Sequence, residues 1–364
     1  MSRNNTLLLL LLLFGFWACN QGQPEATQLP DSGGSKVSLG PEKLSEYGFF
    51  TGNIASQTPA PGVMPYDLAT PLFSDYAYKA RFIKLPDGSQ PAPFNDEDVF
   101  DFPVGTTIIK TFYYPHDMRD ESKGRRLMET RLLVHEEKGW KALPYIWNDE
   151  QTDAILEVAG ARKDVSWVHT DGSKRNLNYV IPNMNQCKGC HINKGNMTPI
   201  GPKARNLNKD YVYTDGSKNQ LEKWHEAGII GELPDMATIS KVPVWNEPST
   251  GSLNDRARAY LEINCAHCHR DGSPANTSGL LLDWHQKNPA ALGINKSPVA
   301  AGRGSGGRLY DIDPGNPDAS IMLFRMDSDD PGIMMPELSR KLIHTEGVAL
   351  IKEWIASLPT NGTK

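Results

Sequence analysis

The pentapeptide Cys187-Lys-Gly-Cys190-His191 is matched later in the chain by Cys265-Ala-His-Cys268-His269. Both have the spacing Cys-x-x-Cys-His, which is the attachment pattern of c-type haem. Two thiols separated by two residues can bond to both vinyl groups of one porphyrin, and the His that follows can ligate the iron. The sequence therefore predicts two covalent haem c groups. Their predicted ligands are the thiols of Cys187, Cys190, Cys265 and Cys268 and, for the two irons, His191 and His269.

Other uses of paired cysteines fit this spacing less well. A zinc ribbon places its two Cys-x-x-Cys pairs roughly 15–20 residues apart, whereas Cys265 follows Cys190 by 75 positions. A thioredoxin-like centre needs a βαβ pattern around its motif, and none is visible here. Structural disulfides are compatible with an exported chain, but they give no reason for a His in the same place twice.

The first 19 residues have the features of a bacterial lipoprotein signal. Arg3 gives a positive start, an apolar run follows from Leu7 to Trp17, and Ala18-Cys19 ends the segment. The run is too short to span a bilayer as a mature helix. We therefore expect export, lipidation of Cys19 and anchoring in the cell envelope, on the periplasmic face or in the outer membrane. An ordinary secretory signal with an incidental cysteine is the alternative.

Composition and length limit the partners and the number of domains. The formal net charge is −5 over 364 residues, which argues against nucleic acid as a partner. Residues 20–40 are polar, contain several Gly, Pro and Ser residues, and are predicted to form a flexible tether. The remaining length predicts two or three domains.

Residues 41–182 are predicted to form a β-rich domain with a sandwich or barrel-like sheet. Residues 76–85 alternate between apolar and polar before a turn at Pro86-Asp-Gly, and residues 105–114 are β-branched and aromatic. Further strands are expected at 130–134, 140–147 and 176–181. Five polar residues within or beside these strands either line a ligand pocket or pair with one another on a sheet face, and pairing is the commoner arrangement. They are Lys110, Glu129, Arg131, Asn148 and Asp153.

Residues 183–245 are predicted to be the first haem-binding region and residues 251–359 a C-terminal cytochrome c domain. In the second, a helix at 254–264 leads to Cys265, and Met334-Met335-Pro336 precedes an amphipathic helix at 346–358. This order of helix, motif, Met-containing loop and closing helix resembles class I cytochromes c. The resemblance implies that Met335 is the distal ligand of the second iron, since a thioether stabilises ferrous iron. Met334 is the rival, and Met322 and Met326 are expected to be packing residues.

The distal ligand of the first iron is left open by the sequence. Met197, Met236, His169 and His225 are the candidates, and an open sixth position is the other possibility. The difference matters because an open iron can bind peroxide or another small ligand, whereas a six-coordinate iron mainly passes electrons.

The chain after the tether also resembles a family of exported dihaem c-type cytochromes. The resemblance rests on the two haem motifs and on several shorter matches, namely Gly105-Thr, Lys110-Thr-Phe, Glu129-Thr-Arg-Leu-Leu, Trp147-Asn, Thr152-Asp-Ala, Arg256-Ala-Arg-Ala-Tyr-Leu, Pro314-Gly-Asn-Pro-Asp-Ala-Ser320 and Met335-Pro. It implies one haem in each of two regions and a role in electron transfer, with no particular substrate.

These observations together predict an α+β multidomain protein, with the β-rich domain followed by mainly α-helical, cytochrome c-like haem regions. The predicted function is a lipid-anchored dihaem electron carrier that exchanges electrons with redox partner proteins of the bacterial envelope. The alternatives are a dihaem peroxidase or oxidase with an open first haem, and a redox subunit of an envelope dehydrogenase complex. The sequence does not decide whether the protein is an enzyme.

Overall fold

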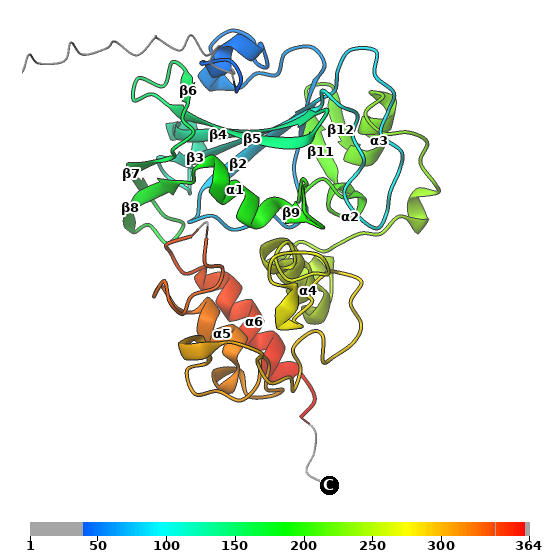
Figure 1. The fold of residues 1–364 in the computed structure, drawn as a ribbon. Helices are drawn as coiled ribbons and strands as arrows, with labels where there is room; N and C mark the ends of the chain where they lie inside the picture. The colour runs from blue at the N-terminus through cyan, green and yellow to red at the C-terminus, as the bar shows by residue number, and fades with distance from the viewer. Residues whose placement is uncertain (1–38, 339, 361–364) are drawn as a thin grey trace, which may run out of the picture. The chain divides into compact units, whose positions relative to one another are not determined.

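The computed structural model describes residues 39–338 and 340–360, and the chain from Leu39 onward forms one compact unit. At its centre is an antiparallel six-stranded sheet whose strands follow one another in chain order. Figure 1 shows α1 beneath this sheet, with α4, α5 and α6 further from it on the same side. The strands are β1 (Val63–Tyr66), β2 (Tyr78–Lys84), β3 (Thr107–Pro115), β4 (Arg125–Glu136), β5 (Gly139–Trp147) and β6 (Ala154–Leu156).

Three two-stranded hairpins and six α-helices complete the regular structure of the described residues. The hairpins pair β7 (Ala161–Val168) with β8 (Lys174–Ile181), β9 (Ile192–Asn193) with β10 (Asn196–Met197), and β11 (Asp210–Tyr213) with β12 (Gly216–Asn219). The helices are α1 (Met184–His191), α2 (Ala204–Leu207), α3 (Gln220–Glu226), α4 (Leu253–Leu261), α5 (Ile321–Met326) and α6 (Thr345–Ser357). A π-helical turn, Glu262–Ala266, continues α4.

The sheet buries apolar side chains on both faces, because neighbouring residues of a strand point in opposite directions. Ile109 and Leu132 pair across β3 and β4 and pack on one face with the N-terminal residues Leu44 and Phe49. On the opposite face, Ile108 packs in a core cluster that also contains Trp224 of α3 and Ile263 of the π-helical turn. That second core cluster therefore joins the sheet to the segment that carries the second Cys-x-x-Cys-His motif.

The predicted fold class is wrong in its second half. The described haem-motif regions are not mainly α-helical: the helices there have between 4 and 13 residues, and β9 to β12 lie among them. Between the π-helical turn and α5, the chain forms loops and short 3₁₀ turns. The reason is visible in composition, because this stretch is interrupted by Pro and Gly, as in Gly302-Arg-Gly-Ser-Gly-Gly307, which break helices. The protein is β-rich, with one open antiparallel sheet in place of a sandwich or barrel.

The multidomain part of that prediction is also corrected, since the described chain is one compact unit in which both ends contribute to shared contacts. Asp75 accepts hydrogen bonds from the backbone amides of Lys341 and Leu342, both at 2.7 Å. Tyr76 donates to Glu346 of α6. Contacts between residues more than 250 positions apart carry no signal in local sequence periodicity. The individual boundaries that we predict at 183–245 and 251–359 are not tested by this division and stay predictions.

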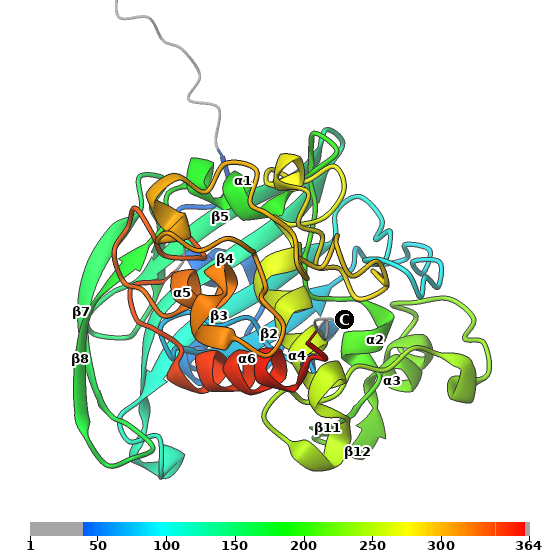
Figure 2. The ribbon, with the colours of Figure 1, turned by 90° about the horizontal axis from the view of Figure 1, so that it is seen from below.

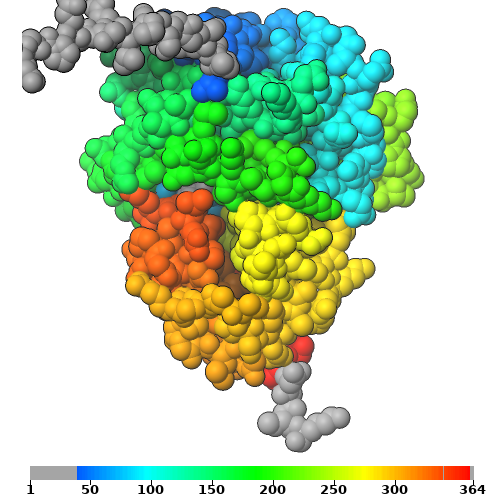
Figure 3. Space-filling view, in the orientation of Figure 1, coloured from blue at the N-terminus to red at the C-terminus, as the bar shows by residue number. Residues whose placement is uncertain are grey.

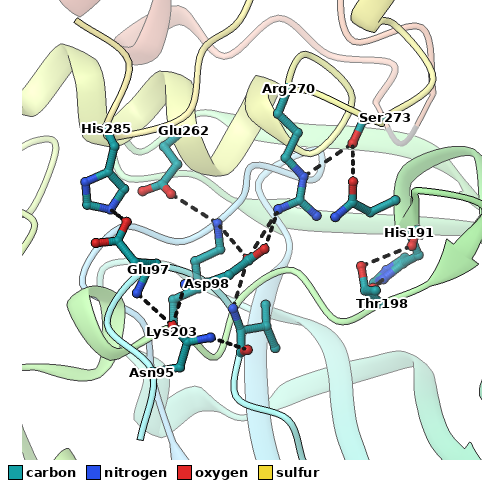
Figure 4. A network of polar contacts seen from close by, with 12 residues as sticks. Asn95, Glu97, Asp98, His191, Thr198, Lys203, Glu262, Arg270, Ser273 and His285 are labelled. Atoms are coloured by element: carbon teal, nitrogen blue, oxygen red, sulfur yellow. Dashed lines mark hydrogen bonds and ion pairs between the residues drawn. The ribbon is translucent and has the colours of Figure 1, made fainter.

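A buried ion network fixes the π-helical turn against α2. The Glu262 carboxylate is 3.1 Å from Lys203 Nζ, and it also pairs with Arg205. All three side chains are buried. Burial alone raises the pKa of Glu262, but the Lys203 and Arg205 cations outweigh it and hold the pKa at about 2. Figure 4 shows Lys203 and Arg270 converging on Asp98, so the loop before β3 joins the same network.

Replacing Glu262 by Gln is expected to lower the free energy of unfolding by about 3–5 kcal/mol, because Arg205 loses its buried counter-charge and Lys203 keeps only the more distant Asp98, at 3.7 Å. Urea unfolding of the intact protein gives the value. The matched control is Asp318→Asn, which breaks the surface pair with Lys352, where the side chains are 82% and 52% exposed; that change is expected to cost no more than about 1 kcal/mol. Equal costs for the two substitutions would contradict the role given to Glu262.

His344 joins the sheet side of the molecule to α6. Its ring stacks on Phe73 at 4.2 Å and lies edge-on to Trp245, and its Nδ1 is 2.9 Å from the Tyr260 hydroxyl. Burial lowers the pKa of His344 to about 4, so the folded protein holds this imidazole neutral.

The lowered pKa predicts a pH-dependent stability. Between the folded pKa of about 4 and the usual value of 6.5, the unfolded chain binds the proton that the folded chain does not, so stability falls as the pH is lowered through this window. His344→Phe keeps an aromatic ring but cannot titrate, and its unfolding free energy is expected to depend less on pH between 7 and 5 than that of the wild type. His116→Phe, at an exposed position, is the control and should keep the wild-type slope.

Candidate functional site

The first motif lies on α1, directly after β8. Asn183 caps this helix: its side chain accepts from the Gln186 amide at 2.9 Å, and the Gln186 side chain accepts from the Asn183 amide at 3.0 Å. This capping box fixes the start of the helix. Residues three apart share one side of a helix, so the cap places the thiols of Cys187 and Cys190 on the same side. Cys187 is buried and Cys190 is partly exposed.

His191, at the end of α1, is oriented by the hairpin that follows it. β9 and β10 return the chain so that the Thr198 carbonyl lies 2.8 Å from His191 Nδ1, and the Thr198 amide donates to the His191 carbonyl at 2.7 Å. A metal-ligating His is usually held in this way through the ring nitrogen that does not bind the metal. Burial, with a smaller effect of Lys110, lowers the pKa of His191 to about 4, so the imidazole is neutral and its Nε2 can act as a ligand.

The second motif follows α4 and the π-helical turn. The amides of Cys268 and His269 both donate to the Cys265 carbonyl, at 3.1 and 2.9 Å. His269 Nδ1 is 3.3 Å from the Ser278 hydroxyl, which again leaves Nε2 as the nitrogen that can bind a metal. Burial lowers the pKa of His269 to about 4. Two histidines from unrelated segments thus have the same local arrangement.

The two motifs meet in the fold. The ligand atoms of Cys190, His267 and Cys268 all lie within 4.8 Å of one another, and the Cys268 thiol is 3.5 Å from the Gly189 carbonyl. The chain next to each motif is also joined, because the Lys194 amide donates to the Gly272 carbonyl at 2.8 Å. In sequence, 75 positions separate Cys190 from Cys265, so this contact could not be predicted from spacing.

The four thiols are free rather than disulfide-bonded, and they differ in acidity. Burial raises the pKa of Cys265 to about 12 and also raises that of Cys187. The neighbouring Cys268 thiol, with a smaller effect of His267, lowers the pKa of Cys190, and the proximity of Cys190 raises the pKa of Cys268.

Each motif carries the two thiols and the His that haem c requires. The group that comes together, Cys190, His267 and Cys268, offers three ligands, one fewer than a structural zinc site and the number of protein ligands at a catalytic one. It uses His267, an intervening residue of the second motif, and leaves out His191 and His269. The face of the molecule is hollowed where the segments around residues 255–285 (yellow) and 320–340 (orange to red) meet the green segment of the first motif (Figure 3). Figure 2 shows the helices of the same region, α4, α5 and α6, side by side across this face of the sheet.

The polar residues of the sheet fall into two groups. Glu129 and Arg131 pair with each other through two hydrogen bonds, at 2.7 and 2.5 Å, and the Tyr179 hydroxyl also donates to Glu129. Lys110 has no ion pair or hydrogen bond among the described residues; its Nζ lies 5.0 Å from the centre of the Phe112 ring. These three face the first motif, since Lys110, Glu129 and Arg131 all act electrostatically on Cys187.

Asn148 and Asp153 take no part in this arrangement. The Asn148 side chain bonds within its own turn, to Thr152, and Asp153 binds Ser45 near the N-terminus of the described chain. Their role is to hold a turn and to attach the N-terminal segment to the sheet.

The structure shows the surroundings of the four residues that the sequence offers as distal ligands of the first iron. Met197 directly precedes Thr198, the residue whose carbonyl holds His191, and pairs with Ile192, so it lies on the proximal side. His225 bonds to Gly231, and Met236 packs at the edge of the core cluster that contains Trp224. His169 is buried beside Tyr76 and receives a hydrogen bond from Trp167. Of the three polar side chains of the sheet that face this motif, Lys110 is the one without a carboxylate partner.

The loop that contains Met335 lies beside the second motif. The Met335 amide donates to the Arg325 carbonyl at 2.9 Å, and Arg340 donates to the Met335 carbonyl. Arg325 acts electrostatically on His269, and Arg340 acts on Cys265. Met334 is buried and Met335 partly exposed, whereas Met322 and Met326 pack in the core of α4 and α6. The distal role of Met335 stays a prediction.

Neither protein-family models nor curated proteins nor solved structures gave a match to this chain. Among the described residues there is also no helix with the length and hydrophobicity needed to cross a membrane.

The neighbouring methionines provide a test of the second iron site. If Met335 is the distal ligand, the ferric protein shows a weak near-infrared sulfur-to-iron band, and Met335→Ala abolishes it and lowers the potential of one haem, because the thioether stabilises ferrous iron. Met334→Ala is the control and should keep the band. Loss of the band in Met334→Ala alone would move the assignment by one residue, and retention in both variants would place the sixth ligand elsewhere.

Proposed function

We propose that this protein is an exported dihaem c-type cytochrome that transfers electrons in the bacterial cell envelope. The observation that carries the proposal is the contact of two complete Cys-x-x-Cys-His motifs at Cys190 and Cys268, each with its His held through Nδ1. Haem c, when bound, supplies reversible one-electron chemistry. A chain that holds both attachment sites in contact can keep two such groups within one compact region.

The surroundings of the motifs support transfer rather than catalysis. The peroxidase or oxidase alternative needs a free acid–base group near the first motif. Glu129 is the carboxylate there, but it is engaged by Arg131 and Tyr179, and an ion-paired carboxylate is a poor proton acceptor at neutral pH. His169 accepts a hydrogen bond from Trp167 at Nδ1 and its ring packs edge-on against Tyr76. These contacts occupy the carboxylate and the imidazole and leave Lys110 as an ionisable side chain beside the first motif without a carboxylate partner. We therefore propose an electron carrier, with redox proteins of the envelope as partners, and keep the peroxidase as the second candidate.

Membrane attachment is part of the proposal and rests on the sequence. Cys19 and residues 20–38 of the predicted tether lie outside the described residues. A lipid at Cys19 would place the carrier at a membrane surface, where a dehydrogenase complex is one possible donor. This anchor stays a prediction.

The composition of the purified protein tests the proposal. Two haem groups per chain are expected to survive acid-acetone extraction, with no stoichiometric zinc, and Cys187→Ala or Cys268→Ala is expected to affect one haem each. Haem is measured by the pyridine haemochrome spectrum and intact mass, and zinc by elemental analysis.

His267 and His269 form a matched pair of controls, because they lie two residues apart in the same motif. His267→Ala should leave the haem content at two, whereas His269→Ala should alter the spectrum of the second haem. A chain that carries zinc and no haem, with zinc lost in His267→Ala, would refute the dihaem proposal.

A further inference from the structure

Three cations stand in one row across the central sheet. The strand register places Arg81 of β2 opposite Lys110 of β3, and Lys110 opposite Arg131 of β4. Residues directly opposite in antiparallel strands have Cβ atoms about 4.5–5.5 Å apart, and like charges in such pairs are destabilising. Lys79 lies on the same face, two residues before Arg81 on β2. We call these four residues the cation row.

Neighbouring carboxylates do not fully balance the cation row. Arg81 pairs with Asp67, whose side chain is 41% exposed, and Arg131 pairs with Glu129. Lys79 donates to the Ala77 carbonyl, and Lys79 and Lys110 both lie over the Phe112 ring. Among the described residues neither ammonium group forms an ion pair with a carboxylate.

Asp75 is the third nearby carboxylate. Its Oδ1 accepts hydrogen bonds from the amides of Lys341 and Leu342. It acts electrostatically on Lys79, but among the described residues it forms no ion pair with Lys79 or Lys110.

The surroundings increase the electrostatic cost of this arrangement. Burial and, to a smaller extent, the neighbouring Arg131 and Arg81 cations lower the pKa of Lys110 to about 7. The pKa of Lys79 is also lowered, by burial and by the same neighbours. Both lysines are partly exposed. The row also faces the first motif, because Lys110 interacts with Cys190 and His191.

We propose that the cation row formed by Lys79, Arg81, Lys110 and Arg131 binds one carboxylate or small oxyanion beside the first Cys-x-x-Cys-His motif. Guanidinium and ammonium groups on one surface are the donors that such anions require. The anion has two possible sources: a carboxylate of the haem itself, which rests on the proposed function, or a small free anion from solution. In either case the site explains why three like charges occupy adjacent strands.

The test compares four forms of the purified protein: wild type, Lys110→Met, Lys110→Arg and Lys84→Met. Met keeps the length of the lysine side chain without its charge, and Arg restores the charge. Lys84 is the control because it lies on β2 but points to the opposite face of the sheet from Arg81. The melting temperature is measured in sodium acetate and in sodium chloride at equal ionic strength, so that screening is the same in both. Haem content is measured first, by the pyridine haemochrome spectrum.

A free anion as the ligand predicts that acetate raises the melting temperature of the wild type above its value in chloride by roughly 2–4 °C. This shift should be lost in Lys110→Met and kept in Lys110→Arg and Lys84→Met. A haem carboxylate as the ligand predicts no acetate effect. Lys110→Met then melts lower than the wild type by a similar amount, and Lys110→Arg restores stability.

The proposal is overturned if Lys110→Met is as stable as the wild type or more stable, with no response to acetate in any form. If no anion is bound, removing one of three like charges relieves repulsion and the melting temperature rises or stays the same. If an anion is bound, the melting temperature falls, so the direction of its change distinguishes the two cases. If Lys110→Met does not fold, Lys79→Met replaces it, and the same changes in melting temperature and in the response to acetate are expected. A protein without haem would refute the proposed function, and its response to acetate would still test the cation row.

Discussion

The position of the second motif depends on one buried carboxylate. Glu262 lies three residues before Cys265 and is held by Lys203 and Arg205, which belong to the segment that follows the first motif. A buried carboxylate without partners is costly in free energy, and a buried cation is equally so. Moving Glu262 away from Lys203 and Arg205 would leave buried charges without a partner. The network therefore holds the two motif-bearing segments together. The interaction of Arg270 with Asp98 extends the same constraint to the loop before β3.

This constraint explains how motifs far apart in sequence come together without a shared helix or hairpin. α1 is positioned from the sheet side, through the end of β8 and the Asn183 cap, whereas the second motif is positioned by α4 and its π-helical turn. π-helical turns are uncommon and are often found at functional sites. Here the turn contributes Ile263 to the core cluster beneath the sheet and Glu262 to the ion network, so it orients Cys265 through packing and charge at once.

Local features of the fold could be predicted from the sequence, and long-range ones could not. The alternation at 76–85 and the β-branched run at 105–114 became β2 and β3, and the amphipathic stretch at 346–358 became α6. Gly228 follows α3 at φ +69, a conformation that glycine adopts without strain. The single compact unit was missed, because it depends on contacts such as Asp75 with Leu342. The pairing of Glu129 with Arg131 could be expected from burial alone, but the isolation of Lys110 depends on strand register.

Several arrangements that cost the chain free energy lie around the same two motifs. Three like charges lie opposite one another across strands, and two partly buried imidazoles have lowered pKa values. Natural sequences break local rules of this kind mainly where function requires it. The other polar residues of the sheet follow the usual rule and pair with neighbours, as Asn148 and Asp153 do. Asn148 and Asp153 thus maintain the fold. The like charges of the cation row have no such structural role, and the binding of a charged group beside the first motif would explain their position.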